Sequence, residues 1–190
     1  MHSPRAILLA LALLLMLGCA QTPHSTRLTV DDFNEMAGQM AQSLLASDAL
    51  AQRTADSPPW FVSMQKMTNL SSDVMTDAEQ WSIMADLRSS TPILDLREMK
   101  NVRFILPYER LQAMRHTDSD FAEDLPENFA YDRHVTHTLT AVIHSLVRAD
   151  QVGRTDLYYA EFQLYDLNTG QPVWIDRFEF QRQARGHLWN

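Results

Sequence analysis

Apolar residues recur at helical spacing in two stretches of the chain. Phe33, Met36 and Met40 lie three and four residues apart, and acidic residues open the stretch, which predicts an amphipathic helix over residues 29–47. The stretch 76–92 begins with a threonine followed three positions later by a glutamate, the spacing of a capping box. An apolar face follows until Pro92, which ends the helix or kinks it. The first half of the chain is therefore expected to contain two helices.

Strand patterns lie between these helices and dominate the last third of the chain. Residues 60–64 and 102–106 are short apolar runs, typical of buried strands. Residues 138–147 alternate between apolar and polar side chains, the period of two that a half-buried strand shows. Residues 157–180 are predicted to form a hairpin, because residues 168–170, Asn-Thr-Gly, have turn chemistry.

The remaining segments complete the predicted order of elements. Residues 68–76 are expected to form a polar loop, and Pro107 is well placed as the first residue of a third helix. Residues 116–130 collect acidic side chains around Pro126 and predict a solvated loop. The order of helix, strand, helix, strand, helix and then a run of strands predicts one α/β (α+β) domain.

The first nineteen residues have the pattern of a bacterial lipoprotein signal. A short start containing Arg5 precedes residues 6–17, which hold no charge and no helix breaker. This is the length of an export signal, whereas a membrane-spanning helix needs about 20 apolar residues. Gly18 and Cys19 follow where a lipobox places the small residue before the cleavage site and the cysteine that becomes acylated. The pattern predicts cleavage after Gly18 and a lipid on Cys19.

A second interpretation of the same residues stays open. The third residue before a lipobox cysteine is usually Leu and the second is usually small, whereas this chain has Met16 and Leu17. Ordinary signal cleavage after Ala20 fits the small residues that flank Cys19. The lipoprotein interpretation is preferred, because the motif and its context agree.

Composition narrows the classes of function. Removing residues 1–18 takes one Arg from the 16 basic side chains, so 15 remain against 24 acidic ones and the net charge is −9. Such a chain argues against nucleic-acid binding and leaves the lipid anchor as the expected membrane contact. Because Cys19 is the only cysteine, no disulfide framework supports the fold. The expected organisation is a signal peptide over 1–18, a short tether over 19–28 and one globular domain over 29–190.

Few residues suggest catalysis or a cofactor. The five glycines are too far apart for a phosphate-binding loop, and no GxSxG elbow exposes a serine. One cluster, His134, His137 and His144 with Asp132 nearby and His116 upstream, contains zinc-ligand residue types. On a strand, however, His134 and His137 point to opposite faces, so solvated or core-edge histidines are the simpler interpretation. We therefore expect a protein that is not an enzyme and holds no metal or cofactor.

The predicted hairpin is rich in aromatic side chains, as are many protein interfaces. Phe162 and Leu164 are among the residues expected to supply one face of the hairpin, and the aromatic residues of 174–180 another. Core packing and cross-strand pairing are the alternative explanation for these side chains. Because strand alternation directs about half of them to the core, Tyr159 and Tyr165 are the first candidates for a partner-binding surface.

Five segments of the chain together resemble a known family. They are the helix over 31–45, the strand over 60–64, residues 103–107, and the hairpin segments 156–170 and 173–176. Their most specific features are the Tyr-Tyr pair, the Asp-Leu-x-Thr-Gly turn and the Trp that follows it. In these features the chain resembles the LpoB group, a family of lipoproteins that activate penicillin-binding proteins. The resemblance covers roughly residues 29–182.

The resemblance implies a compact sheet covered by helices, similar to the N-terminal domain of TolB. It also implies a lipid anchor in the outer membrane, with the domain facing the periplasm. Ala20 and Gln21 lack the Asp that retains a lipoprotein in the inner membrane of enteric-type bacteria. In the family the domain docks on a bifunctional peptidoglycan synthase and stimulates it, and no catalytic residue is implied.

The tether departs from this family. Family activators reach the synthase through a long disordered tether, whereas residues 20–28 extend to about 30 Å at most. That length falls short of crossing the cell wall to a partner on the inner membrane. Two functions therefore stay open: activation of a penicillin-binding protein, and a structural or assembly role in the outer membrane with a different envelope partner.

Overall fold

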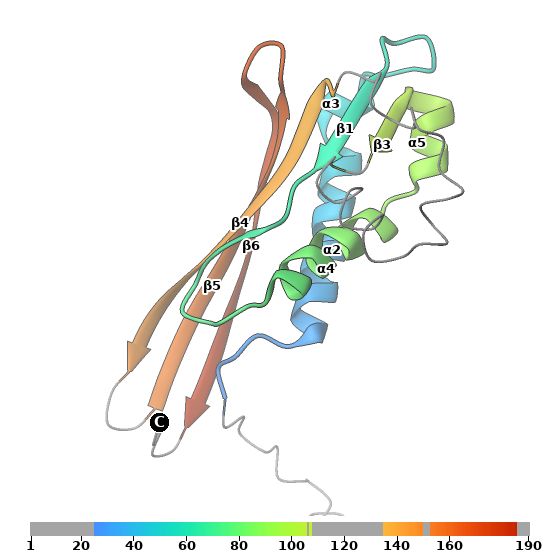
Figure 1. The fold of residues 1–190 in the computed structure, drawn as a ribbon. Helices are drawn as coiled ribbons and strands as arrows, with labels where there is room; N and C mark the ends of the chain where they lie inside the picture. Colours follow the sequence, from blue (N-terminus) through green and yellow to red (C-terminus); the bar gives the residue numbers. More distant parts are fainter. Residues whose placement is uncertain (1–24, 106, 108–134, 150–152, 186–190) are drawn as a thin grey trace, which may run out of the picture.

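The computed structural model describes residues 25–105, 107, 135–149 and 153–185, which form a single sheet packed against helices (Figure 1). The sheet contains six strands. Five of them lie in the order β3-β1-β4-β5-β6, and β2 lies off this path and pairs with β4. The strands are β1 (Trp60–Met64), β2 (Thr68–Leu70), β3 (Val102–Ile105), β4 (His137–Ala149), β5 (Gly153–Asp166) and β6 (Gln171–Arg185). The helices are α2 (Val30–Ala46), α3 (Asp48–Ala51), α4 (Asp77–Ser89) and α5 (Ile93–Lys100). The predicted α/β (α+β) class is confirmed.

The sheet has a parallel half and an antiparallel half. β1 pairs parallel to both β3 and β4, and α4 and α5 lie in the connection from β1 to β3. β4, β5 and β6 follow one another as an antiparallel meander of long strands. The helices gather on one side of this sheet, where α2 packs against α4 and β6 (Figure 1). Within the described part of the chain, no helix is long and apolar enough to cross a membrane.

The two longer helices begin where the sequence predicts. The Thr29 hydroxyl accepts a hydrogen bond from the Asp32 amide at the start of α2, and the Asp32 carboxylate accepts one from the Thr29 amide at 2.7 Å. Thr76 and Glu79 form the same reciprocal capping box at the start of α4. Each box satisfies backbone amides that a helix start otherwise leaves without a partner. Both predicted helices are confirmed.

One face of the sheet carries the core. Alternate residues of β5 are at most 2% exposed, and these are Tyr158, Ala160, Phe162 and Leu164. The buried side of α2, which includes Met36 and Leu44, belongs to the same apolar cluster. We call this side of the sheet the inner face. Its alternation with partly exposed residues confirms the predicted half-buried strands.

The sequence predicts that Trp174, Phe178 and Phe180 of β6 form a different face of the hairpin from Phe162 and Leu164 of β5. This prediction is wrong. Trp174 lies opposite Leu164, and Phe178 lies opposite Ala160. Directly opposed residues of antiparallel strands project to the same side, and both aromatic side chains are 7% exposed. A register shift between Leu164 and Tyr165 changes which residues oppose each other, and the local sequence pattern does not reveal it.

Two short elements, α3 and β2, lie where the sequence predicts no helix or strand, and a third, α5, lies just beyond the proline at which the predicted second helix ends or kinks. β2 occupies the start of the predicted loop 68–76 and is held by pairing with β4. α5 follows Pro92 without a side-chain cap and ends at Asn101, whose φ of 52° is left-handed. Elements this short offer too few residues for a periodic pattern, so tertiary contacts decide them. The predicted helix beyond Pro107 and the predicted loop 116–130 lie outside the described residues.

The same substitution at two glycines is expected to change stability in opposite directions. Gly38 lies in α2 and Gly170 has a φ of 69° in the β5–β6 turn, and neither has an atom within 4 Å of an added Cβ. Gly38→Ala is expected to stabilise the protein by up to about 1 kcal/mol, because Ala is the better helix former. Gly170→Ala is expected to destabilise it by about 1 kcal/mol, because the left-handed region penalises a Cβ. Thermal unfolding measures both, and shifts of the same sign would contradict this account.

Candidate functional site

The side of the sheet opposite the core holds both tyrosines predicted as a contact surface. We call this side the outer face. Its residues are Thr138, Thr140, Val142, His144 and Leu146 of β4, Leu157, Tyr159, Glu161, Gln163 and Tyr165 of β5, and Ile175, Arg177 and Glu179 of β6. All are partly or largely exposed. The described helices lie on the other side of the sheet (Figure 1).

Tyr159 lies at the centre of a stack that crosses three strands. Its ring is nearly parallel to that of His144, with centroids 4.8 Å apart. The Arg177 guanidinium carbon lies 5.1 Å from the Tyr159 ring centroid. Arg177 also forms ion pairs with Glu161 at 3.5 Å and Glu179 at 3.3 Å. We call His144, Tyr159 and Arg177 the outer-face stack, and it holds a large amphipathic ring in a fixed, partly exposed position.

Tyr165 shares the outer face but lies apart from this stack. Six residues separate it from Tyr159 along β5, which corresponds to about 20 Å. Its hydroxyl donates a hydrogen bond to the side-chain oxygen of Gln163. Leu146, which is 59% exposed, is the apolar residue next along β4 on the same face as the stack. The structure therefore places both tyrosines on the outer face of the sheet but not close to each other.

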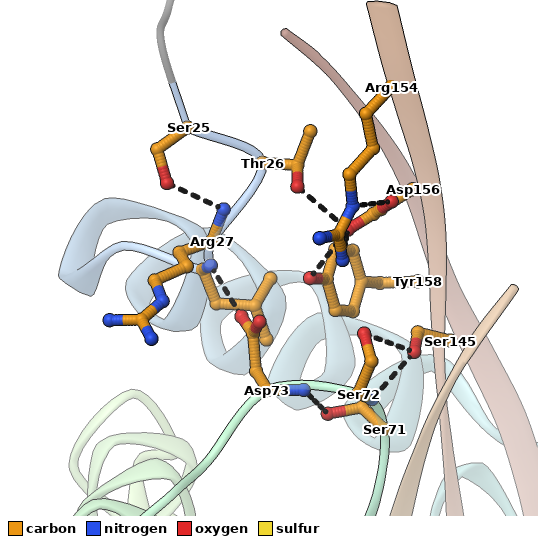
Figure 2. Close-up of polar contacts among 11 residues, drawn as sticks. Ser25, Thr26, Arg27, Ser71, Ser72, Asp73, Ser145, Arg154, Asp156 and Tyr158 are labelled. Carbon is orange, nitrogen blue, oxygen red and sulfur yellow. Dashed lines mark hydrogen bonds and ion pairs between the residues drawn. The ribbon is translucent and has the colours of Figure 1, made fainter. Parts of the chain in front are cut away.

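A buried polar cluster joins the N-terminal segment to β5 (Figure 2). Asp156 is 0% exposed on the inner face. Its carboxylate accepts hydrogen bonds from Nε and Nη2 of Arg154 at 2.8 and 2.6 Å, and from the Thr26 hydroxyl at 2.7 Å. The Tyr158 hydroxyl lies 3.5 Å from the same carboxylate. A residue of the predicted tether is thus bound to a strand 130 positions further along the chain.

Further contacts hold the residues that follow Thr26. The Leu28 amide donates to the Asp73 carboxylate at 2.9 Å, and Arg182 of β6 pairs with Asp32 at the start of α2. We define the N-terminal clamp as Thr26, Leu28, Asp73, Arg154 and Asp156. Because of the clamp, the chain lies against the folded body from Thr26 onward.

The surroundings set the charge states within the clamp. Burial acts to raise the pKa of Asp156, but hydrogen bonds from Arg154 and Thr26 outweigh it and hold this pKa below its usual value. The hydrogen bond to Asp156 raises the pKa of Arg154. Burial raises the pKa of Tyr158 well above the usual value of a phenol. At neutral pH the cluster consists of an ion pair beside a neutral phenol. Such an arrangement can hold two segments of the chain together but is not suited to proton transfer.

The two described histidines of the cluster considered as metal ligands, His137 and His144, lie on different faces. His137 is 4% exposed on the inner face, where its Nδ1 lies 2.8 Å from the Thr136 hydroxyl and its ring 3.9 Å from that of Trp60. Burial lowers the pKa of His137. His144 belongs to the outer-face stack. Among the residues that the structure describes, no group of three or more His, Cys, Asp or Glu is placed to hold a metal ion. Cys19, His116, Asp132 and His134 lie outside them.

Sequence reasoning missed the clamp. Asp156 is two positions before Tyr158, so an acidic residue continues the apolar side of an alternating strand. An acid in such a position needs a buried partner, and this signal was available from the sequence. The sequence did not reveal which residue is the partner, because Thr26 lies in a short polar segment with no local pattern that connects it to β5.

Comparisons with known proteins assign no family. No family model and no curated protein matches the chain. The solved LpoB C-terminal domains from Escherichia coli and Salmonella enterica are 13% and 10% identical, with TM-scores of 0.44 and 0.41, and the alignments cover 78% of this chain and 98% of those. Lipoprotein GNA1162 from Neisseria meningitidis is 13% identical with a TM-score of 0.40, over 66% of this chain and 85% of its own. TM-scores this low establish neither that this chain belongs to the family of these proteins nor that it shares their function.

Proposed function

We propose that the protein is a lipid-anchored protein of the bacterial cell envelope that faces the periplasm and works by binding another protein. The outer-face stack carries this proposal. Tyr159 is partly exposed, fixed between His144 and Arg177, and bordered by the exposed Leu146. Tyr and Arg side chains are enriched at protein interfaces and among the residues that contribute most to binding. The lipid is proposed to sit on Cys19, and the proposed mode of action is binding without catalysis.

Two classes of partner fit this role. The resemblance to the LpoB group supports a peptidoglycan synthase, that is, a penicillin-binding protein. The N-terminal clamp supports the second class, a structural or assembly partner at the outer membrane. Because Thr26 is bound to the domain, only residues 20–25 separate Cys19 from the folded body, about 25 Å when extended. The clamp therefore favours a partner close to the anchoring membrane.

Affinity capture distinguishes the two classes of partner. The tagged full-length chain is captured from detergent-solubilised envelopes, and the bound proteins are identified by mass spectrometry. A Cys19→Ala variant serves as the untethered control. Recovery of a penicillin-binding protein supports synthase activation, which a glycan-polymerisation assay with and without the chain then tests. Recovery of outer-membrane proteins alone supports the structural or assembly role.

Tyr159→Ala is expected to reduce partner recovery about tenfold or more. A central aromatic contact is commonly worth over 1 kcal/mol of binding, and a tenfold change is about 1.4 kcal/mol. The melting temperature is expected to change by only a few degrees, because the side chain lies outside the core. Met99→Ala, at a 63% exposed position on α5, is the matched control. Unchanged recovery with Tyr159→Ala would exclude the outer-face stack as the contact.

A further inference from the structure

β6 forms an open edge of the sheet. It is the last strand in the sheet order, and among the described strands it pairs with β5 alone. The strand is 15 residues long. A long edge strand presents a row of backbone donors and acceptors that another strand can use. The side chains along β6 then decide which strand fits.

The charges of β6 favour one register with a second copy of the chain. When two identical strands pair antiparallel in a continuous sheet, their outer-face residues oppose each other around a twofold axis. An axis beside Arg177 or Glu179 places like charges directly opposite, and an axis beside Asp176 opposes two aspartates. An axis beside Phe178 instead places Arg177 opposite Glu179 of the second copy, twice. Opposite charges across strands stabilise a sheet and like charges destabilise it.

The same register uses most of the strand. Phe178 is the middle residue of β6, so an axis beside it pairs residues 174–182 with residues 182–174 of the second copy, inner face opposite inner face. The register shift near Trp174 ends this regular match before residues 171 and 172. The two Phe178 side chains then face each other on the core side, a favourable cross-strand pair. We propose that two copies of this chain pair antiparallel through β6, around Phe178, to form one continuous sheet.

Charges on an edge strand usually prevent such pairing. Here Arg177 and Glu179 are 51% and 54% exposed and form a 3.3 Å ion pair within their own strand. In the Phe178 register each gains a further opposite charge from the other copy, in addition to the pair that Arg177 already forms with Glu161. In a parallel, in-register pair each faces its own like charge. The edge charges therefore favour this pairing over antiparallel registers centred on Asp176, Arg177 or Glu179 and over the parallel, in-register pair.

The pairing is compatible with anchoring of both copies in one membrane. This compatibility rests on the proposed lipid anchor, whereas the pairing itself does not. Arg182 binds Asp32 and marks where the N-terminal segment meets β6. In the proposed register Arg182 lies opposite Trp174 of the second copy, so the two clamps are eight residues apart, about 26 Å. Tethers of about 25 Å reach a common surface when the strands run along it. A shared membrane also raises the effective concentration of the copies.

Disulfide cross-linking in the full-length chain tests this register. Arg177→Cys and Glu179→Cys variants carrying different tags are co-expressed and oxidised in intact envelopes. Directly opposed Cα atoms lie about 4.5–5.5 Å apart, within disulfide range, so mixed dimers are expected. Each variant alone is expected to form no disulfide cross-link, because its two cysteines are placed about 8 Å apart in the paired copies. Repeating the experiment with Cys19→Ala removes the only natural thiol and keeps the result independent of the anchor.

The cross-links have distinct meanings. Mixed dimers with little self-linkage support pairing around Phe178. Self-linkage of either single variant indicates another register and overturns the proposed one. The absence of cross-links in every combination, with both variants folded, overturns the pairing itself. Both substitutions are at half-exposed positions, so folding is expected to be preserved.

Charge reversal provides a second measurement that needs no thiol. Arg177→Glu and Glu179→Arg, each alone, are expected to weaken dimerisation about tenfold in sedimentation analysis of the detergent-solubilised chain, and their combination is expected to restore it. Lys66→Glu, which breaks the surface pair between Lys66 and Asp77 away from β6, is the control. Failure of the double variant to restore dimerisation overturns the proposed contacts.

Discussion

Replacing Asp156 with alanine is expected to lower the free energy of unfolding by about 3 kcal/mol. The carboxylate is fully buried and accepts hydrogen bonds from Arg154 and Thr26. Its removal leaves a guanidinium and a buried hydroxyl without their partner. The value is at the low end of the range for a broken buried pair, because Arg154 is 26% exposed and can turn toward water. Urea unfolding at pH 7 measures the change.

Glu161→Ala is the matched control for this prediction. Glu161 also lies on β5, but on the outer face, where its 32% exposed side chain pairs with Arg177 at 3.5 Å. Loss of such a surface pair is expected to cost less than about 1 kcal/mol. Asp156→Ala is also expected to speed proteolysis of residues 25–28, because the Thr26 contact is lost. Equal destabilisation by both substitutions would show that the clamp is no stronger than a surface ion pair.

The contribution of Asp156 is expected to depend on pH. Contacts with Arg154 and Thr26 hold the folded-state pKa of Asp156 below the unfolded value of about 3.9. The unfolded carboxyl therefore takes up its proton first as the pH falls, and the stabilisation is complete above that value. It is lost as the pH falls through the lower, folded-state pKa. The difference in stability between the natural chain and Asp156→Asn is expected to shrink below about pH 4.

Cys19→Ala is expected to move almost all of the protein from the membrane fraction to the soluble fraction. Each buried CH₂ of an acyl chain contributes about 0.8 kcal/mol to membrane binding, and loss of the proposed lipid removes all of them. The remaining chain, with a net charge of −9 after removal of residues 1–18, has no electrostatic attraction to anionic lipid. Fractionation of envelopes with and without a high-salt wash measures the shift.

Two observations would contradict the anchor. One is a Cys19→Ala variant that has lost its signal segment and still stays with the membrane after the wash. The other is a natural mature chain that begins at Gln21 without a lipid, as expected for cleavage after Ala20, which mass spectrometry of the N-terminal peptide would detect. The melting temperature is expected to be unchanged in the variant, because Cys19 is the only cysteine and forms no disulfide within the chain.

The sequence predicted the placement of the candidate contact residues better than their grouping. Alternation along β5 was sufficient to direct Tyr158 inward and Tyr159 outward, because the period of two is a property of any extended strand. Alternation does not say which neighbours a residue meets across the sheet. The stack of Tyr159 with His144 and Arg177 depends on the register of three strands, which residues far apart in the chain decide together.

The N-terminal segment shows the same difference between what local sequence patterns predict and what the fold decides. Local composition marked residues 20–28 as a polar spacer, and nothing in them indicates that Thr26 is bound to the domain. The clamp exists because Asp156, an acid on the apolar side of β5, requires partners when it is buried. That need was visible in the sequence, whereas the partner that meets it was fixed only by the fold.

The sequence by itself determined both capping boxes, the first strand and the alternation of the long strands. All of these depend on neighbours within a few residues, where backbone geometry and side-chain period act directly. The tertiary structure alone decided the strand order, the register shift in the hairpin, the short elements and the clamp. These depend on contacts between distant segments, whose free energy appears only when the core assembles and the buried groups find their partners.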